Sequence, residues 1–319
     1  MNKILNLQSS PHVRDNVSTR SIMLDVIIAL LPTSIWGIIR YGKNAFLVIL
    51  VSIICAVASE TIFNKIIKKP NTVNDLSAVV TAMILALNLS PNVPLHIPAI
   101  GSIFAIVVVK MLFGGLGQNF MNPALTARCF LLISFAGPVN KYYETMKEFN
   151  LFGDLDAVSS ATPLAKLAAG ETVELWDMFI GNIPGAIGEV SKICLLLGAI
   201  YLLAKGVIHF RIPLTYIGSF LIFIIIFSGK ASDMNYILGE LLGGGLIFGA
   251  FYMANDYVTS PVTHKGEYIY ATFLGIMTGL FRLYGKSGEC VSFIILLGNI
   301  LVPFFESISI PRPFGKEGK

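Results

Sequence analysis

Charged residues are scarce in this chain. Asp, Glu, Lys and Arg together make up 13% of its 319 residues, whereas soluble domains carry about 25%. Hydrophobic residues make up 55%, and the mean hydropathy is +0.74. Polar side chains are therefore too few to cover a water-soluble globule, which excludes a soluble enzyme or binding module. The membrane is the expected solvent.

Cysteine and histidine are also rare, with four of each. The cysteines fall in or beside separate apolar runs without CxxC spacing, and the histidines show no metal-ligand spacing, so neither a disulfide framework nor a metal site is predicted. We expect no short cleavable signal peptide, because the stretch before the first apolar run, residues 1–21, is polar. The basic residues gather at the ends of apolar runs, which indicates membrane topology rather than nucleic-acid binding.

What the chain has instead is a series of apolar runs near the roughly 20 residues that cross a bilayer as a helix. The runs are continuous rather than alternating, which favours helices over a barrel. They cover 22–40, 44–63, 75–90, 97–113, 121–137, 189–205, 211–228, 235–255, 267–284 and 288–306. The third is short and the tenth contains Glu289 and Asn299, so nine spans or a re-entrant segment is the alternative. We predict an all-α integral membrane protein with about ten transmembrane helices.

The distribution of basic residues predicts that both termini are cytoplasmic, because most of them, including Lys65, Lys110 and Arg211, then lie inside. The hydrophilic segment 138–188 becomes an extracytoplasmic loop between two groups of five spans. Five is odd, so two such groups would be inverted repeats, a common plan for membrane carriers. The expected organisation is a cytoplasmic segment 1–21, a first transmembrane repeat 22–137, the loop 138–188, a second repeat 189–306 and a cytoplasmic tail 307–319.

The segment FGGLGQNFMNPALTAR, residues 113–128, joins glycines to paired amides. Asn119 and Asn122 offer donors and acceptors that suit the edge of a flavin, a quinone or a urea-like ligand. An equally plain interpretation is a loop in which Asn122 caps a helix that begins at Pro123. Arg128 favours a ligand or a polar partner, because a guanidinium inside a span is costly unless it faces one.

The segment DLDAVSSATPLAKLAAGE, residues 154–171, predicts a short helix. Thr162 is the expected N-cap, Pro163 the first helical position and Gly170 the end. The N-terminus of a helix also suits a phosphate. The predicted helix is therefore compatible with a phosphate on the hydroxyl of Thr162.

Five carboxylates lie in or near predicted spans: Asp25, Glu60, Asp75, Glu240 and Glu289. Most are close to predicted membrane interfaces or helix N-termini, where a carboxylate is favourable. Glu240 is the one that lies deepest and is the best candidate for a role in ion transfer.

The stretches GGLGQNFMNPALTAR and DAVSSATPLA, their order and the ten-span plan resemble the RnfD/NqrB family over nearly the whole chain. Its members are membrane subunits of the Rnf complexes and of the Na⁺-translocating NADH:quinone oxidoreductases. The chain is more similar to the RnfD branch, because the quinone-reducing relatives have a longer extension where this chain has residues 1–21.

The resemblance implies a covalent flavin. In the family, the threonine of the S-x-A-T-P-L motif carries FMN through a phosphoester bond that a flavin transferase forms. The matching residue here is Thr162, with Ser160 and Pro163 beside it. Ser160 stands where a glycine is common in the motifs of sister subunits, and attachment is still expected because the alanine, threonine and proline are present.

The resemblance also implies a second, non-covalent flavin, riboflavin, near the glycine-asparagine motif. The residues expected around it are Gly117, Asn119, Asn122 and Arg128. The polar stretch MANDYVTSP, residues 253–261, is expected to contribute Asn255, Asp256 and Thr259 to the same cavity.

The implied function is electron transfer within a ferredoxin:NAD⁺ oxidoreductase that moves Na⁺ or H⁺ across a bacterial inner membrane. The chain would act with the other Rnf subunits (A, B, C, E and G) in the lipid bilayer and would not be catalytic alone, because the flavins supply the chemistry. The alternatives are a urea-transporter-like channel without a redox centre and a structural anchor for redox partners. Both would be colourless, so a flavin absorption band discriminates.

Overall fold

The computed structural model describes residues 17–142, 161–285 and 290–310, and these residues form helices and no strand. The helices are α1 (Thr19–Ile67), η1 (Val73–Asp75), α2 (Ser77–Leu87), α3 (His96–Ile103), η2 (Phe104–Met111), α4 (Pro123–Ser134), α5 (Ala136–Val139), α6 (Pro163–Ala168), α7 (Leu175–Ile180), α8 (Lys192–Ala204), α9 (Arg211–Phe227), α10 (Met234–Leu242), α11 (Leu246–Phe248), η3 (Gly249–Met253), α12 (His264–Tyr284) and α13 (Val291–Ser309). Of the η elements, η1 is a 3₁₀-helix and the other two are π-helices.

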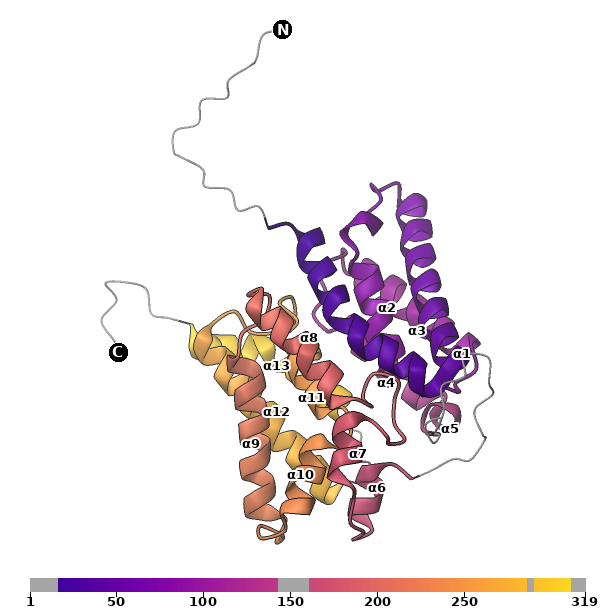
Figure 1. Ribbon diagram of the computed structural model, residues 1–319. Coiled ribbons are helices and arrows are strands. Elements are labelled where there is room, and N and C mark those ends of the chain that lie inside the picture. Colours follow the sequence, from indigo (N-terminus) through magenta and orange to yellow (C-terminus); the bar gives the residue numbers. More distant parts are fainter. Residues whose placement is uncertain (1–16, 143–160, 286–289, 311–319) are drawn as a thin grey trace, which may run out of the picture.

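The first two predicted spans are the two limbs of α1, which has 49 residues and is broken only at Gly42. Gly42 has φ 65° and ψ −148°, a conformation that glycine adopts without steric cost. Figure 1 shows the limbs meeting at a sharp bend. The expected loop between 40 and 44 is therefore a kink within one helical element.

Each of the ten predicted ranges contains a helix. By length and composition, α1 and α13 can cross a membrane, and the pair Met234–Leu242 and Leu246–Met253, bent by 53°, makes a third candidate if it is one span. Shorter apolar helices fill most of the other ranges. The short third run is helical over only 11 residues, in α2. The number of crossings stays a prediction.

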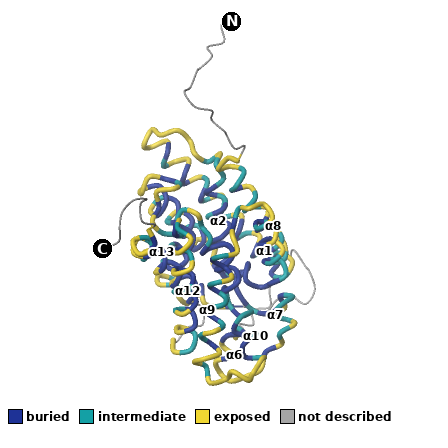
Figure 2. Tube along the Cα trace, turned by 90° about the vertical axis from the view of Figure 1, so that its left-hand side faces the viewer, coloured by how far each residue is buried: buried dark blue, intermediate teal, exposed yellow. Residues whose placement is uncertain are grey.

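Large apolar side chains cover the outward faces of the long helices. On α9, Leu214, Ile222 and Ile226 are at least 60% exposed. Figure 2 shows the buried positions in the middle of the molecule and exposed ones on its outer edges. Exposed apolar surface of this extent is unfavourable in water and suits contact with lipid. The fold is that of an all-helical membrane protein.

The helices before residue 142 gather on one side of the molecule and those after residue 190 on the other (Figure 1). α1 packs against α8, and α4 packs against α13. α1 contains the first predicted span of the first half, and α8 is the first predicted span of the second half. α4 and α13 are the fifth predicted spans of their halves. Any site between the halves is therefore built from both.

Candidate functional site

The loop between η2 and α4 turns at three glycines with left-handed backbone. Their φ values are +120° at Gly114, +103° at Gly115 and +88° at Gly117. A Cβ at Gly115 or Gly117 would have no neighbour within 4 Å among the residues described. The backbone conformation, rather than a lack of space, is what requires glycine here.

The two asparagines that follow these glycines have different roles. Asn122 caps α4, because its Oδ1 accepts from the N–H groups of Ala124 (3.1 Å) and Leu125 (3.3 Å), and Pro123 is the first helical residue, as predicted. Asn119 is 5% exposed and donates through Nδ2 to the carbonyl of Met121 at 3.4 Å. Its Oδ1 is buried without a partner. Asn119 therefore retains an acceptor for a ligand.

A cavity lies between the two halves, and both asparagines line it. The first half contributes Asn119, Asn122 and Lys110, and the second half contributes Asn255 and Asp256 among mostly apolar side chains. The expectation that 253–261 reaches the same cavity is thus confirmed for Asn255 and Asp256. It is wrong for Thr259, which does not line the cavity and instead donates to Asp256 Oδ2 at 3.2 Å.

Lys110 is a cavity residue that sequence reasoning assigned to the cytoplasmic surface. It is 2% exposed, and its Nζ donates to Glu60 Oε1 (3.1 Å), Glu60 Oε2 (3.0 Å) and Ser77 Oγ (2.6 Å). Glu60 is fully buried and also accepts from Thr72. Glu60 therefore belongs to a buried ion pair, and its place near a membrane interface stays a prediction.

Arg128 has the polar surroundings that its place in a span demands. NH1 donates to Asn88 Oδ1 (3.0 Å) and Ser292 Oγ (2.6 Å), and NH2 lies 3.6 Å from Glu189 Oε1. Arg128 does not line the cavity of Asn119, and Gly117 does not either. Arg128 instead links the two halves, since Asn88 precedes residue 142 and Glu189 and Ser292 follow it.

Thr162 begins α6 as predicted. Its Oγ1 accepts from the N–H of Ala165 at 3.3 Å, and Pro163 is the first helical residue. Leu164 and Leu167 are buried, and α6 packs against α10. These contacts hold Thr162 half-buried at the edge of the fold. Ser160 lies outside the described residues.

A small pocket opens beside Thr162. Its other lining residues include Pro163, Gly185, Glu189, Lys192 and Gly244. Lys192 is 1% exposed and donates to the carbonyls of Glu189 and Gly244. Thr162 and the buried Lys192 therefore line the same pocket.

Comparison with known proteins places these features in one family. The model of the NQR2, RnfD, RnfE family matches residues 6–315. The chain belongs to this family.

The similar relatives are D subunits of redox complexes. The one from the Na⁺-translocating ferredoxin:NAD⁺ oxidoreductase complex of Acetobacterium woodii is 44% identical over 321 residues, which cover 99% of this chain and 97% of the relative. The one from the proton-translocating ferredoxin:NAD⁺ oxidoreductase complex of Clostridium ljungdahlii is 38% identical, covering 98% and 96%. The one from the ion-translocating oxidoreductase complex of Stutzerimonas stutzeri is 33% identical, covering 95% and 94%.

Glu240 forms an ion pair with Arg282. Its Oε2 lies 3.3 Å from NH1 of Arg282, whose NH2 donates to the Gly243 carbonyl at 3.0 Å. The Arg282 guanidinium also lies 5.0 Å from the ring centre of Phe220. Glu289 lies outside the described residues. The Arg282 side chain is therefore buried among Glu240, Gly243 and Phe220.

Sequence reasoning missed Lys110 and Lys192 as site residues. Both lie near the end of an apolar run, where a basic residue normally indicates topology. The sequence around Lys110 carries no sign of burial, since its partners are 33 and 50 residues away, and one acceptor of Lys192, the Gly244 carbonyl, is 52 residues away. The signal in the sequence that could have indicated their burial is that each lysine lies inside a predicted span rather than after its end.

Proposed function

We propose that this chain is the D subunit of an Rnf-type complex, and that it transfers electrons while the complex couples ferredoxin:NAD⁺ oxidoreduction to ion translocation. The family membership and the names of the relatives support the assignment. The relatives are named for Na⁺ in one case and protons in another, so the proposal includes both ions. The partners are the other Rnf subunits (A, B, C, E and G).

The proposal places FMN on Thr162 through a phosphoester formed by a flavin transferase. The observation that carries it is the position of Oγ1, which lies half-buried at the start of α6 and beside a pocket with a buried lysine. A hydroxyl in this position is accessible for modification, and the neighbouring cation suits a phosphate.

We also assign a non-covalent riboflavin to the cavity between the halves. Its mostly apolar walls suit the flat ring system, and the unpartnered Oδ1 of Asn119 suits the N–H donor on the polar edge of a flavin. When bound, flavins supply one-electron transfer. The chain contributes the cavity, the acceptor on Asn119 and the neighbouring Lys110–Glu60 pair.

The two proposed flavin sites are connected along α4. Asn122 at its N-terminus lines the cavity, and Arg128 lies six residues on, about 9 Å along the helix axis. Arg128 pairs with Glu189, which lines the pocket of Thr162. The helix α4 and the Arg128–Glu189 pair thus join the cavity to the pocket of Thr162, which suits electron transfer between the two sites.

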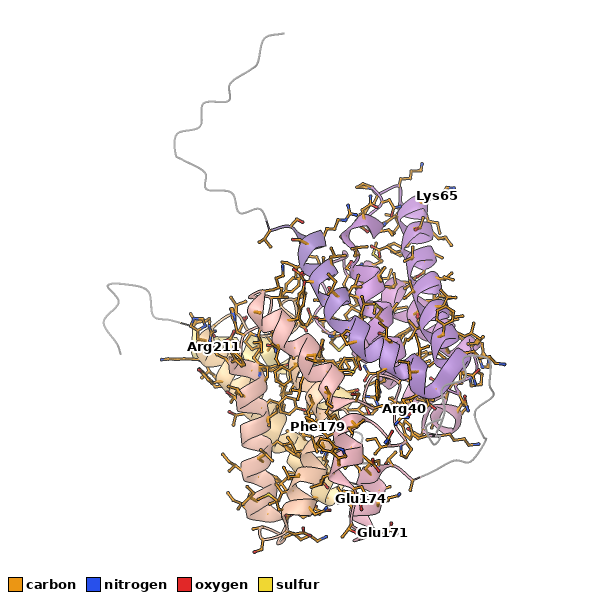
Figure 3. The ribbon with its side chains drawn as sticks, in the orientation of Figure 1. Arg40, Lys65, Glu171, Glu174, Phe179 and Arg211 are labelled. Atoms are coloured by element: carbon orange, nitrogen blue, oxygen red, sulfur yellow. The ribbon has the colours of Figure 1, made fainter. Side chains whose placement is uncertain are left out.

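We further propose ten crossings in two inverted five-helix repeats, with the loop 138–188 on the extracytoplasmic side of the membrane. The contacts of α1 with α8 and of α4 with α13 support the repeat. In Figure 3, Lys65 lies at one end of the molecule, and Glu171 and Glu174 lie at the opposite end. If Lys65 is cytoplasmic, the end that carries Thr162 faces outside.

The decisive experiment is mass spectrometry of the peptide that contains Thr162, together with in-gel flavin fluorescence. Thr162→Ala should abolish the covalent flavin while the chain still inserts into the membrane. Thr172→Ala is the matched control, because it removes an exposed threonine of the same segment and should leave the flavin in place. Fluorescence that persists in the Thr162→Ala band would refute the attachment site, and a colourless wild-type protein would favour the channel.

A further inference from the structure

Lys192 is a buried cation without a carboxylate partner among the described residues. It is 1% exposed, and its Nζ donates only to two carbonyl groups, those of Glu189 and Gly244. No carboxylate oxygen in the described part of the chain lies within ion-pair distance of Nζ. Burial of an ammonium ion without an anion is costly, so an anion is expected beside it.

The nearby carboxylates are each paired with an arginine. Glu189 lies 3.6 Å from Arg128, and Glu240 lies 3.3 Å from Arg282. A Cβ on Gly244 would come within 3.3 Å of Arg282 NH2, so this second cation also lies close to the pocket. The two arginines balance the two carboxylates, so the charge of Lys192 is left unmatched and favours an additional anion.

The pocket that Lys192 lines opens next to the hydroxyl of Thr162. We propose that Lys192 is the counter-ion of the phosphate that links the flavin to Thr162. A phosphate esterified on both sides carries one negative charge, which matches the single charge of Lys192. The ion pair would dock the start of α6, together with its flavin, onto the N-terminus of α8. This inference rests on the flavin attachment proposed above.

The proposal predicts that the contribution of Lys192 to the stability of the protein depends on the flavin. In flavinylated protein, Lys192→Gln should lower the midpoint of thermal unfolding of the full chain in detergent, because it removes one member of a buried ion pair. In the Thr162→Val background, Lys192→Gln should raise the midpoint or leave it unchanged, because it removes an uncompensated charge. Any effect of losing the Thr162 cap is common to both Thr162→Val proteins and cancels in this cycle.

Two controls keep the charge or remove one elsewhere. Lys192→Arg should retain most of the wild-type midpoint. Lys205, an exposed lysine at the C-terminal end of α8, is the matched lysine, because it lies about 20 Å from Lys192 along the helix axis. Lys205→Gln should therefore give the same shift with and without the flavin. Equal shifts for Lys192→Gln in both backgrounds would overturn the proposal.

A second measurement observes the phosphate directly. In detergent, the ³¹P resonance of the phosphodiester on Thr162 should differ between flavinylated wild type and Lys192→Gln and should be the same in wild type and Lys205→Gln. An unchanged resonance in Lys192→Gln would count against the ion pair. If mass spectrometry finds no flavin on Thr162 in the wild type, the proposed function fails and the inference fails with it. If the flavin is present and the Lys192 results are equal, only the inference is overturned.

Discussion

The buried pair of Lys110 and Glu60 should dominate the stability of the first half of the molecule. All three donors of the Lys110 ammonium are used, two by Glu60 and one by Ser77. Lys110→Met leaves the Glu60 carboxylate fully buried with a threonine hydroxyl as its remaining partner. Removal of one member of such a pair costs about 3–5 kcal/mol. Lys110→Met and Glu60→Gln should therefore each lower the free energy of unfolding by about this amount.

The double variant distinguishes an ion pair from simple packing. When both charges are absent, no uncompensated charge remains, and replacement of a whole buried pair is often neutral. Glu60→Gln/Lys110→Met should consequently be more stable than either single variant, with a coupling energy of at least about 1 kcal/mol. The assay is unfolding of the purified chain in mixed micelles, followed by fluorescence.

Lys65 provides the control for this cycle. It lies in the last turn of α1, on the same element as Glu60, and is exposed. Lys65→Met should change the stability by less than about 0.5 kcal/mol. The reasoning would be refuted if the single variants lost less than about 1 kcal/mol, or if their losses simply added in the double variant.

Two further predictions concern the site. Arg128→Lys should destabilise the protein by about 2 kcal/mol, because one ammonium nitrogen cannot replace both NH1, which donates to Asn88 and Ser292, and NH2, which lies 3.6 Å from Glu189. Chemical denaturation measures this, and unchanged stability would contradict it. Asn119→Leu should abolish binding of the non-covalent flavin, because the unpartnered Oδ1 acceptor is lost, while the covalent flavin on Thr162 remains. Chromatography of solvent extracts measures the riboflavin, and a wild-type ratio of riboflavin to protein would contradict the role of Asn119.

Surface variants serve as controls for these two predictions. Arg20→Lys changes an exposed arginine at the start of α1 and should leave the stability unchanged. Asn71→Leu changes an exposed asparagine outside the cavity and should leave the riboflavin content unchanged.

Local features of the fold were predictable from the sequence because the signals act over a few residues. Continuous apolar runs placed a helix in each of the ten ranges. The Asn-Pro and Thr-Pro pairs predicted that Asn122 and Thr162 cap helices, and both do. The cost of a guanidinium in a span predicted a polar partner for Arg128, which is present.

The tertiary structure alone decided which residues meet. Arg128 contacts Ser292, 164 positions away, and Lys110 contacts Glu60, 50 positions away. Such pairings depend on how helices cross and which faces they turn toward one another, and hydrophobic periodicity in a nearly all-apolar helix does not specify the buried face.

The sequence by itself therefore determined the membrane setting, the helices and the threonine with its cap, because hydrophobicity and capping are properties of neighbouring residues. Only the packed structure decided that Gly42 kinks one long helix, that Asn119 and Asp256 share a cavity, and that Lys192 lies buried beside Thr162. The physical reason is that a charge acquires its meaning from burial and partners, and both are set by the fold.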